Sequence, residues 1–336
     1  MTLDANLNAD IFRNVILNNI HHSNKNVLHD ILEINDDNTV LLCANDKTSR
    51  FQNSLLSLYK SPDDLTAQNV FTVLREEVTT SAAAFINNKL IFVAEDSGTV
   101  KLCTTDTYDG KHDKLKTVAK NAAHQDVVNS VVKLANSTNC VTAGNDLEIK
   151  IWETNYIEDR FTGVHSYYPA HRDFITGLTV NKTEENIFGS CSNDCTSFLW
   201  DLRKSTPASG LFKSDYGLKC ITWQPDSTVI AFGDCDGTIL LVDSRCPGAA
   251  FKTIYGFSAE IQNLEFCPTN PKLLAACADD TIVKVINIEK DNPNCTIYEE
   301  NVHSSLVRSL AWNRDSCTLY SCGYDNKICT HNIETV

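Results

Sequence analysis

Short apolar runs alternate with polar turns along most of the chain. One stretch reads V-V-N-S-V-V-K-L, then N-C-V-T-A, then E-I-K-I-W, with connections rich in Asn, Asp and Ser. Alternating apolar and polar residues are typical of β-strands with one buried face, and segments of helical period are nearly absent. The pattern predicts an all-β protein.

The strand pattern also repeats. Asp194 precedes Trp200 by six residues, and the same offset recurs in G-N-D-L-E-I-K-I-W, C-D-G-T-I-L-L-V, D-D-T-I-V-K-V-I and Y-D-N-K-I-C-T-H. Two weaker copies upstream carry Ser97 or Asn53 in place of the aspartate. The seven anchors, spaced 42 to 49 residues apart, are Tyr59, Cys103, Trp152, Trp200, Val242, Ile286 and His331. This period is typical of four-stranded blades and predicts a seven-bladed β-propeller.

A histidine and a hydroxyl residue accompany the aspartate in three of the copies. These sets are His124, Thr142, Asp146 and Trp152; His171, Ser190, Asp194 and Trp200; and His303, Ser321 and Asp325, followed by a histidine at the tryptophan position. They match the hydrogen-bonded tetrad of WD repeats, in which aspartate accepts from histidine and the hydroxyl links histidine to the indole N–H. We expect the tetrads to pin loops to the inner strands of each blade.

A His-Ser-Asp set also occurs in catalytic triads, but a triad occurs once, whereas this set repeats with the blade period. Cys191 and Cys195 could suggest a metal site, yet a zinc site needs four ligands and no second Cys or His pair has ligand spacing. We therefore expect no catalytic residues, no metal and no cofactor, and interpret both cysteines as packing residues.

The chain reaches I-C-T-H-N-I-E-T-V soon after the seventh anchor, which leaves no sequence for that blade's outer strand. The run Ile11–Leu17 is the candidate to complete it and to protect the blade edge. We predict an N-terminal segment of residues 1–26 with this closing strand, and a single propeller domain of residues 27–336.

Composition and charge narrow the classes of partner. The net charge is −14, from 29 basic and 43 acidic residues, which disfavours phosphate backbones and favours basic proteins. No apolar run has the length of a membrane span, the N-terminus is acidic where a signal peptide is basic, and the 14 cysteines are scattered. We expect an intracellular protein, cytoplasmic and nuclear, without direct contact to nucleic acid or membrane and with most cysteines reduced and buried.

The predicted blade-1 turn, K-T-S-R-F-Q-N, departs from the plain repeat because it is extended and carries an aromatic residue at its tip. Arg50, Phe51, Gln52 and Asn53 are the candidate partner-binding residues, with Phe51 as an exposed anchor. A ring folded inward is the alternative from the residues alone.

Several segments resemble the methylosome protein 50 family, the WD-repeat partners of the symmetric, type II protein arginine methyltransferase. They are I-F-V-A-E-D-S-G-T-V-K-L, H-Q-D-V-V-N-S-V-V-K-L, S-C-S-N-D-C-T-S-F-L-W-D-L-R, F-G-D-C-D-G-T-I-L-L-V-D and Y-D-N-K-I-C-T-H-N. The resemblance covers residues from about 27 to the end.

This resemblance implies a non-catalytic subunit of a hetero-oligomer that binds the methyltransferase N-terminal domain and presents arginine-rich substrates, histones and Sm proteins. Family members carry a tryptophan in the blade-1 turn, where Phe51 or Gln52 falls here, and this divergence suggests an invertebrate member with germ-plasm proteins as further candidate partners. The acidic charge fits basic substrates independently.

Two other functions compete with this interpretation. Trp200–Arg203 matches the Trp-Asp-x-Arg signature of cullin-4 ubiquitin ligase substrate receptors, and Val242–Arg245 echoes it. A generic WD-repeat scaffold is the remaining alternative, because propellers serve many functions.

Overall fold

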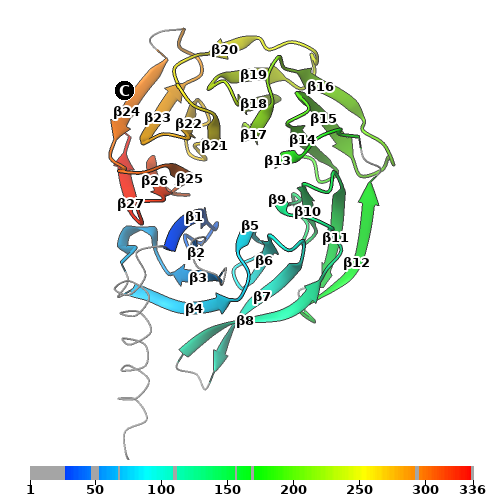
Figure 1. Ribbon diagram of the computed structural model, residues 1–336, viewed down its shortest axis with the longest axis vertical. Helices are drawn as coiled ribbons and strands as arrows, with labels where there is room; N and C mark the ends of the chain where they lie inside the picture. Colours follow the sequence, from blue (N-terminus) through cyan, green and yellow to red (C-terminus); the bar gives the residue numbers. More distant parts are fainter. Residues whose placement is uncertain are drawn as a thin grey trace, which may run out of the picture.

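The computed structural model describes residues 27–46, 53–66, 69–108, 112–155, 157–167, 170–291 and 295–333. These residues form seven antiparallel sheets in a ring, six with four strands and one with three (Figure 1). Each sheet is a blade, and its strands follow the chain from the centre outward. The predicted all-β, seven-bladed propeller is confirmed.

The innermost strands of blades 1 to 7 are β1 (Val27–Ile34), β5 (Thr80–Phe85), β9 (Val128–Lys133), β13 (Ile175–Val180), β17 (Leu218–Trp223), β21 (Ile261–Phe266) and β25 (Val307–Trp312). The second strands are β2 (Val40–Asp46), β6 (Leu90–Glu95), β10 (Cys140–Gly144), β14 (Ile187–Ser192), β18 (Val229–Asp234), β22 (Leu273–Ala278) and β26 (Thr318–Gly323). The third strands are β3 (Asn53–Tyr59), β7 (Val100–Tyr108), β11 (Ile149–Asn155), β15 (Thr196–Asp201), β19 (Ile239–Asp243), β23 (Ile282–Asn287) and β27 (Ile328–Asn332). The outer strands are β4 (Val70–Glu76), β8 (His112–Asn121), β12 (Arg160–Tyr167), β16 (Ser209–Lys213), β20 (Lys252–Ile254) and β24 (Thr296–Asn301), and a 3₁₀ turn, η1 (Pro62–Asp64), follows β3.

Burial along the strands reflects their place in the ring. The second strands β2, β6 and β22 are buried at every position, because neighbouring blades cover both of their faces. The outer strand β12 is exposed at most positions and buried at none. The hydrophobic core therefore lies between adjacent blades, as where Phe92 of blade 2 packs against Trp152 of blade 3.

Blade 7 packs directly on blade 1 and closes the ring. Leu32 and Val40 share one apolar cluster with Ala311 and Tyr320. Arg314 Nε donates to the Ile34 carbonyl oxygen at 3.0 Å, which ties the two blades together at the strand ends.

The predicted closing strand, Ile11–Leu17, lies outside the described residues, as does all of segment 1–26. Within the described part of the chain, blade 7 has the three strands β25, β26 and β27.

The ring has two faces that the connections define. Because strands within a blade are antiparallel, the connections between blades and the turns from second to third strands lie at the same end of the ring. We call this end the tetrad face. The connections from first to second and from third to fourth strands lie at the other end, which we call the opposite face. Among the described residues, no helix has the length and apolar character needed to cross a membrane.

Candidate interaction surface and its supporting tetrads

Blade 3 contains one continuous chain of side-chain hydrogen bonds. Trp152 Nε1 donates to Thr142 Oγ1 at 2.7 Å, and His124 Nε2 lies 2.7 Å from the same hydroxyl. His124 Nδ1 lies 2.7 Å from Asp146 Oδ2. Burial acts against the charged carboxylate, but the hydrogen bonds from His124 and two backbone amides outweigh it and lower the pKa of Asp146. The chain ties the loop before β9 to the turn between β10 and β11.

Blade 4 repeats the arrangement. Trp200 Nε1 donates to Ser190 Oγ at 2.8 Å, His171 Nε2 lies 2.7 Å from that oxygen, and His171 Nδ1 lies 3.2 Å from Asp194 Oδ2. The indole ring stacks on Phe188 at an interplanar angle of 4°. Ser190 has no exposed surface, so its hydroxyl cannot reach a substrate carbonyl as a nucleophile would. The geometry gives this His-Ser-Asp set a structural role.

Blade 7 has a histidine where blades 3 and 4 have tryptophan. His331 Nε2 lies 2.8 Å from Ser321 Oγ, and His303 Nε2 lies 2.8 Å from the same atom. His303 Nδ1 lies 3.0 Å from Asp325 Oδ1, and His331 Nδ1 lies 2.8 Å from the Tyr298 hydroxyl.

One proton arrangement satisfies every group of blade 7 with both histidines neutral. His303 Nδ1–H donates to Asp325, so its Nε2 accepts from the Ser321 hydroxyl. Ser321 Oγ then accepts from His331 Nε2–H, and Tyr298 donates to His331 Nδ1. Burial lowers the pKa of His331 to about 4, which favours this neutral form. His331 therefore replaces the indole N–H as the donor.

Blades 2 and 5 have different polar contacts near the tetrad-face ends of their second and third strands. In blade 2, Lys101 forms ion pairs with Glu76, at 2.5 Å, and with Glu95. In blade 5 the carboxylate that accepts from the turn amides is Asp234, through Thr238 N at 2.8 Å, and not the aspartate of the sequence repeat two residues later. Among the described residues, the full hydrogen-bonded sets are confined to blades 3, 4 and 7.

The candidate partner-binding turn is described only in part. Asn53 begins β3, is half-buried and pairs with Asp46 across the hairpin. Arg50, Phe51 and Gln52 lie outside the described residues.

The two Trp-Asp-x-Arg-like segments have the same geometry. Arg203 donates to both Asp201 oxygens at 2.8 Å, and Arg245 donates to Asp243 Oδ2 at 2.8 Å. The bidentate hydrogen bonds from Arg203 lower the pKa of Asp201 to about 2. Both arginine side chains are about 70% exposed, so these segments present fixed guanidinium groups on the opposite face.

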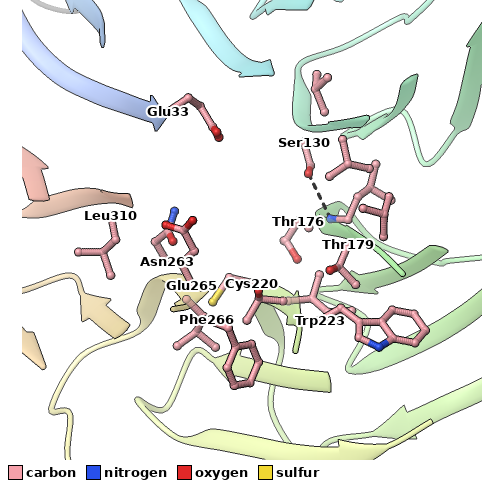
Figure 2. A pocket seen from close by; sticks show the side chains of 18 of the residues that line it. Glu33, Ser130, Thr176, Thr179, Cys220, Trp223, Asn263, Glu265, Phe266 and Leu310 are labelled. Carbon is pink, nitrogen blue, oxygen red and sulfur yellow. Dashed lines mark hydrogen bonds between the residues drawn. The ribbon is translucent and has the colours of Figure 1, made fainter. Parts of the chain in front are cut away.

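A cavity of about 390 Å³ lies between the inner strands, at the centre of the ring (Figure 2). Glu33, Asn263 and Glu265 point into it, and Arg314 also lines it. Burial raises the pKa of Glu265, while the Arg314 guanidinium, 3.8 Å away, acts in the other direction. Sequence reasoning missed this site because its residues come from separate blades. The polar residues inside the inner-strand runs were the available signal.

Most of the cysteines contribute to packing. Eight of the 14 are buried, including Cys191 in β14. Cys195 differs from expectation: it lies half-buried in the turn before β15, with φ of +68°. Among the described residues, no group of three or more His, Cys, Asp or Glu side chains is placed to hold a metal ion.

Comparison with a family model identifies the repeat. Residues 162–201, 211–243 and 294–332 match the model described as WD domain, G-beta repeat. Each match begins near an outer strand and ends at the third strand of the next blade. The sequence repeat is thus offset from the structural blade by one strand.

Among curated proteins, the chain is similar to Methylosome protein WDR77 of Xenopus laevis, with 26% identity over 302 residues, 88% of this chain and 87% of that protein. This match confirms the resemblance to the methylosome protein family. Other relatives match over a shorter part of their own length. The Denticleless protein homolog of Danio rerio is 25% identical over 54% of this chain and 30% of that protein, and human Protein transport protein Sec31A is 24% identical over 66% and 18%.

The fold recurs in solved structures. A chain of a structure titled "COPII on membranes, outer coat vertex" matches with a TM-score of 0.78 over 92% of this chain and 85% of that chain. The sequence identity is 20%, so the likeness concerns the fold alone.

Proposed function

We propose that this WD-repeat β-propeller is a non-catalytic subunit of a protein arginine methyltransferase complex in the cytoplasm and nucleus. It binds the methyltransferase N-terminal domain through the blade-1 turn and helps to present arginine-rich substrates such as histones and Sm proteins, with germ-plasm proteins as further candidate partners. The observation that carries the proposal is the similarity to a methylosome protein across most of both chains. The matches to Denticleless and Sec31A cover less than a third of those proteins.

The charge and the buried tetrads support a binding role rather than catalysis. A net charge of −14 attracts basic partners over long range. The side chains of the repeated His-Ser-Asp sets form hydrogen bonds with one another within the blades. Ser190 and Ser321 have no exposed surface, so a substrate cannot reach their hydroxyl groups.

The second candidate is a cullin-4 ligase substrate receptor. The observation that favours it is the fixed, exposed guanidinium of Arg203, repeated one blade later in Arg245.

Co-purification of the tagged full-length chain from its native cells separates these functions. A methyltransferase in near-equal amount, with a native mass equal to a complex of the two, supports the first proposal. The ligase adaptor in its place supports the second, and recovery of neither leaves a scaffold of another kind.

The binding site is tested by Phe51→Ala. We expect affinity for the methyltransferase to fall by about 2 kcal/mol or more, roughly 30-fold, as for a buried aromatic hot spot. Phe251→Ala is the matched control, because Phe251 is 59% exposed on the opposite face, in a connection of blade 5. Undiminished affinity of a normally folded Phe51 variant would show that the turn is not the anchor.

A further inference from the structure

Among the described residues, three aromatic side chains are exposed on the tetrad face. Phe174, Tyr216 and Tyr255 keep 44%, 48% and 75% of their surface exposed. They lie in three successive connections between blades, before β13, before β17 and after β20. These connections follow one another around the ring (Figure 1). A large exposed aromatic in each of three neighbouring loops is typical of a binding surface.

The loops that carry these rings are held by hydrogen bonds. The Phe174 loop is tied to blade 4, since Arg172 N donates to Asp194 Oδ2 at 2.8 Å and Asn193 N to the Phe174 carbonyl at 3.0 Å. The Tyr216 loop is held on both sides, through Ser214 N to the Cys195 carbonyl at 2.8 Å and Cys235 N to the Gly217 carbonyl at 2.9 Å.

The Tyr255 loop is fixed in the same way. Lys284 Nζ donates to the Gly256 carbonyl at 2.6 Å, and a Cβ at Gly237 would lie 2.6 Å from the Phe257 carbonyl oxygen, so the loop lies directly on the blade-5 turn. The three rings are therefore exposed on ordered loops, and a partner would lose little conformational entropy of this chain on binding.

The two faces of blades 4 to 7 differ in charge. The described connections of the tetrad face carry two basic residues, Arg172 and Lys327, and eight acidic residues: Asp173, Asp194, Asp215, Asp236, Glu260, Asp279, Asp280 and Asp325. The described connections of the opposite face carry seven basic residues and six acidic ones. The negative charge in the loops of these blades is thus concentrated on the face that presents the aromatic rings.

We infer that the arc of Phe174, Tyr216 and Tyr255, with the carboxylates around it, docks a linear peptide segment rich in arginine. Guanidinium groups stack on aromatic rings and pair with carboxylates, and this face offers both on ordered loops. The inference rests on the proposed function for the source of the peptide, a substrate of the complex, and it names the surface that the substrate contacts.

The test measures binding of a fluorescent synthetic peptide of alternating Arg and Gly to the full-length chain by anisotropy, with a Glu-Gly peptide as the charge control. We expect salt-sensitive binding of the Arg peptide alone. The double variant Tyr216→Ala/Tyr255→Ala should lose at least about 10-fold in affinity, as for two truncated contact residues. Asp215→Asn/Asp236→Asn should lower the affinity and weaken its salt dependence.

Matched variants on the opposite face provide the controls. Ile157→Ala and Phe251→Ala remove side chains that are 79% and 59% exposed, and Asp226→Asn removes one charge there. These should leave affinity within about two-fold. The inference is overturned if the unmodified chain does not bind the peptide or if the double tyrosine variant binds it with unchanged affinity. It is also overturned if the opposite-face variants lose as much affinity as the double tyrosine variant. Because no methyltransferase is present, this outcome is independent of the co-purification result.

Discussion

The hydrogen-bonded set of blade 7 predicts a specific dependence of stability on pH. Burial lowers the pKa of His331 from 6.5 to about 4, so between these values the unfolded chain binds a proton that the folded chain does not. The unfolded state is therefore favoured as the pH falls from about 6.5 to about 4. At 1.36 kcal/mol for each pKa unit, His331 alone removes up to about 3 kcal/mol of stability over this range.

The substitution His331→Gln isolates this contribution. A glutamine amide can place an N–H near the position of His331 Nε2 and donate to Ser321 Oγ, but it does not titrate. At pH 7.5 we expect a loss of only about 1 kcal/mol, the net worth of an imperfect hydrogen bond. Below pH 6.5 the variant should lose less stability than the unmodified protein, and the two curves should converge or cross.

The carboxyl group of Glu33 changes the stability with pH in the opposite direction. Burial raises the pKa of Glu33 to about 7, with the Glu265 carboxylate adding to the shift, so the folded state holds an extra proton between about 4.5 and 7 and gains stability as pH falls. Both proteins contain Glu33, so the difference between their curves removes this effect.

The assay is urea unfolding followed by tryptophan fluorescence at several pH values from 7.5 to 4.5, together with an NMR titration of the His331 ring. His165→Gln is the control, because the His165 side chain is 68% exposed and pairs with the exposed Glu153. If the unfolding curves of the His331 variant stay parallel to those of the unmodified protein at every pH, or if the His331 ring titrates near 6.5, the reasoning fails.

Three further predictions concern stability. Ser190→Ala leaves the buried Trp200 Nε1–H and His171 Nε2 without a hydrogen-bond partner and should cost about 2–4 kcal/mol in urea unfolding, whereas Ser190→Thr, the residue type of blade 3, should recover part of the loss. Arg314→Ala removes the hydrogen bonds to the Ile34 carbonyl at the seam of blades 1 and 7, so amides of β1 should exchange faster with deuterium. Deletion of residues 1–20 should lower the melting temperature, because Ile11–Leu17 is the predicted closing strand; an unchanged melting temperature would exclude that strand.

The fold could be predicted because each repeat carries its characteristic residues within a short stretch of sequence. Five of the seven blades carry an aspartate six residues before the anchor position of the third strand, so Trp152 and Trp200 could be used to find the weaker copies of the repeat. The hydrogen-bond partners of the tetrads follow from residue type and spacing for the same reason.

The features that could not be predicted from the sequence depend on contacts between distant parts of the chain. The role of His331 Nε2 as a donor requires Tyr298, 33 residues earlier on the outer strand of blade 6, to donate to His331 Nδ1. Glu33 and Glu265 line the same central cavity because the ring brings the inner strands of blades 1 and 6 together there. The exposure of Tyr216 and Tyr255 depends on what their loops pack against, which the spacing of the repeat does not give.

The tetrads and the proposed docking surface are physically connected. Phe174 lies three residues after His171, and the carboxylate that holds His171 also accepts from Arg172 N, so the tetrad sets the position of the aromatic ring as well as that of the strands. In a hydrolase a His-Ser-Asp set is catalytic. Here the same residue types keep a loop ordered while its aromatic side chain stays exposed. Since the Asp194 carboxylate is half-buried and occupied by hydrogen bonds of this network, the charges available to a partner are those of its neighbours, such as Asp173 and Asp215. Loss of the tetrad should therefore weaken peptide binding through disorder of the Phe174 loop, without removing any contact residue.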